Sequence, residues 1–224
     1  MAGYYTDNLS AGRLRLCYDI APLRVRQYLE AEIQHVLSRI RPRDLVLELG
    51  CGFGRVLERL LPKAGAVVGI DASPSSLQLA RELHRTFPDL HLAAMNAISL
   101  GFPNAVFDVV ICIQNGISAF DVNQQDLMSE AVRVVKPGGA VLFSSYSDRF
   151  WEDRLAWLEQ QAEHGLIGEI DRQRTRDGVI VCRDGFKATT IGRDGFRTLT
   201  AALGLRAAIE EVDGSSIFCE INPG

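Results

Sequence analysis

The segment from Glu48 to Gly54 restricts the possible folds of this chain more than any other, because three of its seven residues are glycines. It lies between a short apolar run, Leu45–Leu49, and a segment in which apolar residues recur at helical spacing. Glycines at positions 50, 52 and 54 permit a tight turn and allow the backbone to approach a ligand closely. A strand, a glycine-rich turn and a helix in this order predict an α/β fold with a ligand beside the turn.

The alternation of strands and helices continues after this turn. Helices separate most of the further strands, which are predicted over Ala66–Ile70, Leu90–Met95, Phe107–Ile113 and Ala140–Ser145. Apolar runs without polar alternation are typical of a parallel sheet that is covered on both faces. Near the end, Asp213-Gly214 joins the runs Arg206–Val212 and Ser215–Ile221, and a two-residue link requires an antiparallel pair.

Charge and composition exclude several classes of protein. Lys and Arg total 24 against 28 acidic residues, so the net charge of −4 offers no general attraction for a polyanion. The longest uncharged stretch, Leu90–Phe107, contains asparagines, a histidine and a proline, and is too polar to span a membrane. No secretory signal is visible at the N-terminus. The five scattered cysteines form no CxxC pair and no metal-ligand spacing, so we expect reduced cysteines, no metal and a cytoplasmic location.

An acidic residue follows the second strand at a position that suits a nucleoside. Asp71 lies seventeen residues beyond Gly54, and a carboxylate there can accept hydrogen bonds from both hydroxyls of a ribose. The dinucleotide fingerprint G-x-G-x-x-G/A is incomplete, because counting from Gly50 and Gly52 places Arg55 at its third glycine position. An NAD-dependent oxidoreductase is therefore an alternative that the glycine spacing disfavours.

Motifs over about residues 45–145 resemble those of the class I S-adenosylmethionine-dependent methyltransferases. The matching segments, in chain order, are Glu48–Gly54, Val68–Ser73, Asn96-Ala97, Phe102-Pro103, Phe107–Val110 and Arg133–Gly139. The resemblance implies a Rossmann-like, doubly wound, mostly parallel seven-stranded sheet that ends in an antiparallel strand pair. That architecture also accounts for the hairpin at Asp213-Gly214.

The resemblance further implies the cofactor S-adenosyl-L-methionine, with S-adenosyl-L-homocysteine as its product. Glu48 and the backbone of Gly50, Gly52 and Gly54 would hold the methionine moiety. Asp71 would bind the ribose, and Ala72 would pack on the adenine. Asn96 would bind the adenine amino group, with the N–H of Ala97 at a ring nitrogen. Since the family usually has aspartate at position 96, we expect weaker binding there.

The end of the fourth strand, Ile113–Gly116, lies where the family places groups near the reactive methyl. Gln114 is assigned to the cofactor and Asn115 to the acceptor, although an Asn-Gly turn without a function would also explain Asn115. A general base is needed only if the acceptor arrives protonated. The candidates for that role are Tyr5, Tyr18, Tyr146 and His164, but packing tyrosines and an exposed helix-end histidine are the plainer interpretations.

We predict a single domain over residues 1–224 that divides into four parts. These are an N-terminal helical cap (1–43), a cofactor-binding core (44–147), a hairpin insertion (165–192), and a C-terminal helix with antiparallel strands (193–224). A helix is also expected over Asp148–Glu163. The cap and the insertion, with its turn signals Asp177-Gly178 and Asp184-Gly185, would form a lid over the methyl group.

The predicted function is an enzyme that transfers a methyl group from S-adenosylmethionine to a small-molecule acceptor by direct displacement. A cofactor-binding partner or sensor without catalysis is the alternative outside enzymes. A nucleic-acid methyltransferase is disfavoured by the net charge, although seven arginines within residues 1–43 keep it open. The acceptor, its reacting atom and a homodimeric state are left open by the sequence.

Overall fold

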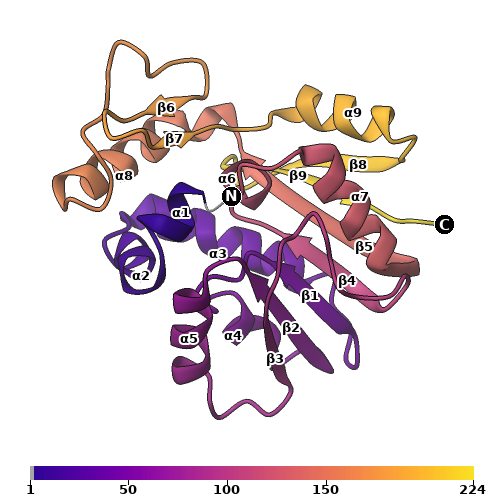
Figure 1. Ribbon diagram of the computed structural model, residues 1–224. Helices are drawn as coiled ribbons and strands as arrows, with labels where there is room; N and C mark the ends of the chain where they lie inside the picture. The colour runs from indigo at the N-terminus through magenta and orange to yellow at the C-terminus, as the bar shows by residue number, and fades with distance from the viewer. Residues whose placement is uncertain (1–2) are drawn as a thin grey trace.

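A seven-stranded sheet in the order β3-β2-β1-β4-β5-β9-β8 forms the centre of the computed structural model, which describes residues 3–224 (Figure 1). The strands are β1 (Leu45–Leu49), β2 (Ala66–Asp71), β3 (Leu90–Ala94), β4 (Phe107–Cys112), β5 (Val135–Tyr146), β8 (Ala207–Val212) and β9 (Ser216–Ile221). Strands β1 to β5 pair in parallel, whereas β9 pairs antiparallel with β5 and with β8. The predicted mostly parallel sheet with an antiparallel pair at its end is confirmed.

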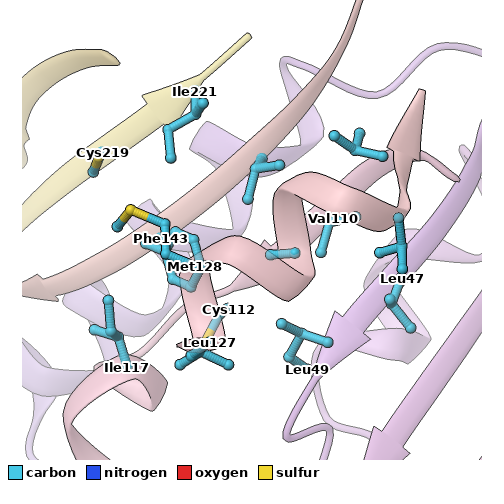
Figure 2. Close-up of a cluster of buried hydrophobic side chains, with 14 of the residues drawn as sticks. Leu47, Leu49, Val110, Cys112, Ile117, Leu127, Met128, Phe143, Cys219 and Ile221 are labelled. Atoms are coloured by element: carbon cyan, nitrogen blue, oxygen red, sulfur yellow. The ribbon is translucent and has the colours of Figure 1, made fainter. Parts of the chain in front are cut away.

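Helices cover both faces of the sheet. One face carries α3 (Leu23–Leu37), α4 (Leu57–Leu60) and α5 (Pro74–Leu83), and the other carries α7 (Gln124–Val134) and α9 (Arg193–Ala202). Side chains alternate along each strand, so Val46 packs toward α3 while Leu47 packs toward α7. Figure 2 shows the buried hydrophobic cluster on the face that α7 covers, where Leu127 and Met128 lie against the sheet.

Local signals in the sequence account for several element ends. Ser73 caps α5, and its Oγ accepts a hydrogen bond from the N–H of Ser76, in line with the preference for serine at helix N-caps. The predicted start of β5 at Ala140 is too late, because the strand already begins at Val135. Val135 pairs with Phe107 and Ala140 pairs with Val109, so the Lys-Pro-Gly-Gly segment bulges within the strand.

A second group of elements lies beyond the carboxyl ends of the parallel strands (Figure 1). It comprises α1 (Tyr4–Asp7), α2 (Ala11–Asp19), α8 (Trp151–Glu163), β6 (Ile180–Val181) and β7 (Lys187–Ala188), with a 3-10 turn over Asp148–Phe150 before α8. The indole N–H of Trp157 donates to the carbonyl of Cys17 at 2.9 Å, and Leu9, Leu158 and Phe186 share one buried cluster. The N-terminal helices therefore pack directly on α8 and the hairpin.

The remaining short helix, α6 (Gly116–Ala119), follows β4. Within residues 3–224, none of the helices combines the length and the apolar character that crossing a bilayer requires.

Candidate active site

A cavity of about 290 Å³ lies at the carboxyl ends of β1, β2, β4 and β5, where open α/β sheets bind their ligands. Side chains from α1, α2, α8 and the hairpin close its other side. The structure brings nearly all of the predicted site residues to this cavity: Tyr5, Tyr18, Glu48, Gly50, Gly52, Asp71, Ala72, Asn96, Ala97, Gln114, Asn115 and Tyr146 line it. Gly54 and His164 are not among the residues that line it.

The glycine-rich turn between β1 and α4 has the left-handed backbone that its sequence predicts. Gly50, Gly52 and Gly54 have φ angles of +75°, +54° and +88°. A Cβ on Gly50 would lie 2.3 Å from Cζ of Phe120, and one on Gly54 would lie 2.8 Å from the ring of His84. Gly54 therefore contributes through the shape of the turn rather than as part of the cavity wall.

Glu48 is a buried carboxyl at the end of β1. Its Oε2 has no hydrogen-bond partner among the described residues. Burial raises the pKa of Glu48 to about 8, even though the nearby Arg55 guanidinium acts in the opposite direction. A ligand that brings a cationic hydrogen-bond donor would satisfy this oxygen and favour its ionised form.

Asp71 is oriented by the backbone on both sides. Its Oδ2 accepts a hydrogen bond from the N–H of Gly52 at 2.8 Å, and its Oδ1 accepts one from the N–H of Ser73 at 2.7 Å. Burial raises the pKa of Asp71, while these backbone donors lower it. Each carboxylate oxygen retains a further acceptor position for a ligand hydroxyl.

The residues after β3 form a more open part of the wall. Asn96 is exposed, and its Oδ1 accepts a hydrogen bond from the N–H of Ile98 at 3.1 Å. The side chain is thus held in a local turn with its Nδ2 group left available. Ala72 and Ala97 line the cavity beside it.

Gln114 and Asn115 follow β4 with φ angles of +57° and +65°. The Oδ1 of Asn115 accepts from the hydroxyl of Ser145 at 2.7 Å, and its Nδ2 donates to the carbonyl of Thr189 at 3.0 Å. Both ends of this side chain therefore join parts of the protein. That arrangement favours a structural role for Asn115 over direct binding of the acceptor.

A buried glutamate that sequence reasoning missed holds the backbone at this point. Glu32 of α3 accepts hydrogen bonds from the N–H of Gln114 at 2.7 Å and from the hydroxyls of Ser144 at 2.8 Å and Ser216 at 2.6 Å. Burial raises the pKa of Glu32 to about 7. Its helical spacing with Tyr28 and Val36 places Glu32 on the buried side of α3, whereas Glu30 is half-buried and pairs with Arg59.

The candidate bases differ in position and in protonation. Tyr5, Tyr18 and Tyr146 line the cavity, and burial raises the pKa of each, for Tyr146 to about 12. At neutral pH they are phenols that donate hydrogen bonds rather than bases. His164 is exposed at the end of α8, where its Nδ1 lies 2.8 Å from the carbonyl oxygen of Gln160. The structure does not bring His164 to the site.

The comparisons with known proteins agree with this geometry. Residues 46–139 match a family model described as "Methyltransferase domain". The 2-methyl-6-phytyl-1,4-hydroquinone methyltransferase of Synechocystis sp. is 30% identical over 188 residues, which cover 75% of this chain and 56% of that protein. The arsenite methyltransferase of Aquipseudomonas alcaligenes is 29% identical, over 80% of this chain and 60% of that protein.

Solved structures show the same architecture over nearly the whole chain. The PH0226 protein from Pyrococcus horikoshii OT3 superposes with a TM-score of 0.68 at 26% identity, covering 92% of this chain and 94% of that one. The DhpI-SAM-HEP complex superposes with a TM-score of 0.65 at 20% identity, covering 98% and 94%. This chain carries a methyltransferase domain over residues 46–139. It spans about half the length of the curated relatives that it matches.

Two features of this cavity fit S-adenosylmethionine. The unpartnered Oε2 of Glu48 suits the ammonium of the methionine moiety, and the Asp71 carboxylate suits a ribose. Arg55 is a residue that sequence reasoning used only to exclude a dinucleotide. Its guanidinium lies 4.5 Å from the centre of the Tyr18 ring and donates to Oε1 of Gln114, and its Nε has no partner among the described residues.

Among residues 3–224, one group of potential metal ligands lies away from the cavity. Ligand atoms of His35, Glu210 and Glu220 lie within 4.8 Å of one another. Arg39 pairs with both carboxylates, at 3.2 Å for Glu210 and 2.8 Å for Glu220. A cationic side chain therefore already pairs with both acidic groups of this cluster.

Sequence reasoning expected the hairpin as part of the lid, but it missed α8 and the individual side chains that form this wall. Arg154, Trp157 and Phe186 line the cavity, and all three are buried. The available signal was the helical spacing of Arg154 with Leu158 and Gln161, which places the arginine on the buried side of α8. A long charged residue on such a face is more often expected to reach solvent.

Proposed function

We propose that this methyltransferase transfers the methyl group of S-adenosylmethionine to a small-molecule acceptor. The observation that carries the proposal is the buried, unpartnered Oε2 of Glu48 beside the glycine-rich turn, in the same cavity as Asp71. Relatives named for a hydroquinone, for demethylmenaquinone and for arsenite support a small-molecule acceptor. The net charge of −4 supports the choice of a small molecule over a nucleic acid.

The residues that would hold the cofactor come from three strand ends. Glu48 would accept a hydrogen bond from the ammonium group, while Gly50 and Gly52 allow the backbone to approach the methionine moiety. Asp71 would bind the ribose hydroxyls. Ala72, Asn96 and Ala97 would contact the adenine. The bound cofactor supplies a methyl group on a sulfonium, which is activated for transfer to a nucleophile.

The chain's part in the transfer is to position the acceptor and exclude water. The neutral phenols of Tyr5, Tyr18 and Tyr146 can donate hydrogen bonds but do not take up a proton at neutral pH. We therefore propose that the acceptor arrives with a free electron pair and attacks the methyl carbon directly. Correct orientation of the two reactants lowers the barrier by several kcal/mol, roughly 7–11 in favourable cases.

The N-terminal helices and the hairpin are proposed to act as the cover of this site. Arg13 of α2 donates from Nη2 to the carbonyls of Gly165 at 2.8 Å and Leu166 at 2.9 Å. On the other side, the N–H of Ala11 donates to the hydroxyl of Ser76 at 3.0 Å. These contacts attach α2 to both sides of the cavity, so opening it would require that some of them break.

We also propose a cytoplasmic location, which is supported by the chemistry of the cysteines. All five are buried and unpaired. Burial raises the pKa of Cys17, Cys182 and Cys219, each to about 12, which keeps these thiols protonated.

Calorimetric titration tests the cofactor assignment. S-adenosylmethionine and S-adenosylhomocysteine are expected to bind, and NAD is not. Incubation with methyl-labelled S-adenosylmethionine and a metabolite extract, with total RNA and DNA in parallel reactions, then identifies the acceptor class. Label in a metabolite supports the proposal, and label preferentially in nucleic acid contradicts it. Tight cofactor binding with no transfer to either pool would indicate a sensor or partner protein instead.

A further inference from the structure

Arg154 is a buried cation in the wall of the cavity. It projects from α8, and only 1% of the residue is exposed. Its guanidinium carbon lies 4.6 Å from the centre of the Tyr146 ring. Nη1 donates to the carbonyl of Gly178 at 2.9 Å, and Nη2 lies 3.4 Å from the carbonyl oxygen of Thr189. Nε has no hydrogen-bond partner among the described residues.

No carboxylate neutralises this charge within residues 3–224, since Arg154 takes part in none of the ion pairs formed there. Asp148 and Asp177 line an outer hollow beside Arg154, but both are exposed and neither pairs with it. Glu32 is instead bonded to Ser144 and Ser216. Because a buried charge without a counter-ion is costly, the missing partner is expected to be a ligand.

The position of Arg154 assigns it to the acceptor side of the cavity rather than to the cofactor side. The Arg55 guanidinium lies 4.5 Å from the centre of the Tyr18 ring and donates to Gln114, whereas Arg154 lies over Tyr146 and donates to the carbonyl of Gly178. Burial lowers the pKa of Arg154, while Tyr146, Tyr5 and Tyr28 act in the opposite direction. The two arginines thus belong to different parts of one cavity.

The aromatic rings around Arg154 indicate the shape and polarity of the rest of the acceptor. Tyr5, Tyr146, Trp157 and Phe186 line the same cavity, and the Tyr5 ring lies 5.9 Å from that of Phe186 in an edge-on arrangement. Aromatic walls favour a flat, apolar body with large contact area. The phenol hydroxyls of Tyr5 and Tyr146 add neutral donors close to the guanidinium.

We propose that the acceptor is a small organic oxyanion whose carboxylate or phosphoryl group pairs with Arg154, while its apolar body packs against the surrounding aromatic rings. This inference rests on the proposed function, because it concerns the acceptor of that same site. It makes Arg154 a residue that determines substrate specificity.

The test compares anionic and neutral ligands of one shape. Benzoate, phenylphosphonate and benzamide are titrated calorimetrically into the protein with and without S-adenosylhomocysteine. At least one of the two anions is expected to bind tenfold or more tightly than benzamide, and the tighter anion distinguishes carboxylate from phosphoryl recognition. In Arg154→Gln, which retains amide donors without the charge, anion binding is expected to weaken at least tenfold while benzamide binding changes little.

Two further variants separate charge from structure. Arg154→Lys keeps the charge and is expected to retain more anion affinity than Arg154→Gln. Arg172→Gln removes an exposed cation that pairs with Glu159 outside the cavity, and is expected to bind all three probes like the wild type. Circular dichroism checks that each variant is folded.

Anions that bind no more tightly than benzamide to the wild-type protein would overturn the inference, whether or not the variants fold. Equal anion affinity in folded Arg154→Gln and wild type would also overturn it. The same titrations test the proposed function separately. The proposed function fails if S-adenosylhomocysteine does not bind, whereas the titrations without S-adenosylhomocysteine still measure anion recognition.

Discussion

The N–H of Gly52 donates a 2.8 Å hydrogen bond to Oδ2 of Asp71, nineteen residues further along the chain. A second backbone donor, the N–H of Ser73, binds the other oxygen of the same carboxylate at 2.7 Å. The group that we assign to the ribose is therefore oriented by the backbone of two separate segments. The glycine-rich turn and the acidic residue act as one unit, so a change in either is expected to affect cofactor binding.

Replacement of Asp71 by alanine is expected to weaken the binding of S-adenosylmethionine by roughly 10–100-fold. Each charge-assisted hydrogen bond contributes about 1.5–3 kcal/mol, partly offset by water, and 1.4 kcal/mol corresponds to a factor of ten. Isothermal titration calorimetry measures the change. Asn96→Ala provides the comparison, because a neutral bond contributes about 1 kcal/mol. Unchanged affinity in folded Asp71→Ala would place the ribose elsewhere.

Binding of S-adenosylhomocysteine is expected to release a proton from Glu48. Burial raises the pKa of this carboxyl to about 8 in the free protein, so at pH 7 it is mostly protonated. An ammonium group at Oε2 favours the ionised form, which lowers the pKa in the complex. Affinity should therefore rise from pH 6 to pH 8 and level off above the free pKa. Calorimetry in two buffers of different ionisation enthalpy counts the released protons.

Glu48→Gln serves as the control for this proton release. The amide cannot ionise, so the variant should bind more weakly and lose the part of the pH dependence that Glu48 contributes. Titration of the ligand's own groups is common to both proteins and cancels in the comparison. The same proton count in wild type and variant would exclude Glu48 as the source.

Gly50→Ala is expected to lower the free energy of unfolding more than Gly138→Ala, although the two glycines have nearly the same φ, +75° and +74°. A left-handed backbone costs a non-glycine residue about 1–3 kcal/mol at either position. Only at Gly50 would the new Cβ also meet a side chain, 2.3 Å from Cζ of Phe120, whereas the space at Gly138 is open. Urea unfolding measures the loss of stability in each variant.

Phe120→Ala should reduce the additional loss of stability in Gly50→Ala, because it removes the ring that the new methyl group meets. The double variant Gly50→Ala/Phe120→Ala is then expected to be less destabilised than the sum of its single changes. Equal destabilisation by Gly50→Ala and Gly138→Ala would show that the contact with Phe120 has no energetic weight.

Arg13→Ala is expected to loosen the cover without removing the cofactor site. Arg13 donates to the carbonyls of Gly165 and Leu166 and, through Nε at 2.8 Å, to that of Asn8. Loss of charge-assisted bonds of about 1.5–3 kcal/mol each should speed hydrogen exchange in α1 and α2 about tenfold or more. Methyl transfer should fall, while calorimetry should show cofactor affinity nearly unchanged.

Arg15→Ala is the matched control for the cover. Arg15 lies on the same helix, is exposed, and makes one ion pair with Asp19 at 3.7 Å, which contributes little in water. Exchange and transfer should remain close to those of the wild type. If Arg13→Ala exchanged no faster than Arg15→Ala, the contacts of Arg13 would not hold the cover in place.

The sequence by itself determined the sheet, the glycine-rich turn and the set of strand ends at which the cofactor residues gather. These features follow from short-range patterns. The spacing of apolar residues distinguishes strand from helix, Gly50 adopts a left-handed turn, and Ser73 caps the helix after β2. Parallel strands then bring Glu48 and Asp71 to one edge, because their carboxyl ends point the same way. The start of β5 was missed because a Lys-Pro-Gly-Gly segment is typical of a loop, yet here it bulges within a paired strand.

Only the tertiary structure decided which polar groups are free to act. Asn115 bonds to Ser145 and Thr189, 30 and 74 residues away, so its side chain is occupied in a way that no local motif indicates. His164 lies outside the cavity, whereas Arg154, ten residues earlier, is buried in its wall without a carboxylate partner. The physical reason is that desolvation and pairing depend on neighbours that are distant in the sequence. The charge state of Glu48 and the partner of Arg154 are therefore properties of the folded cavity, not of the residues around them in the chain.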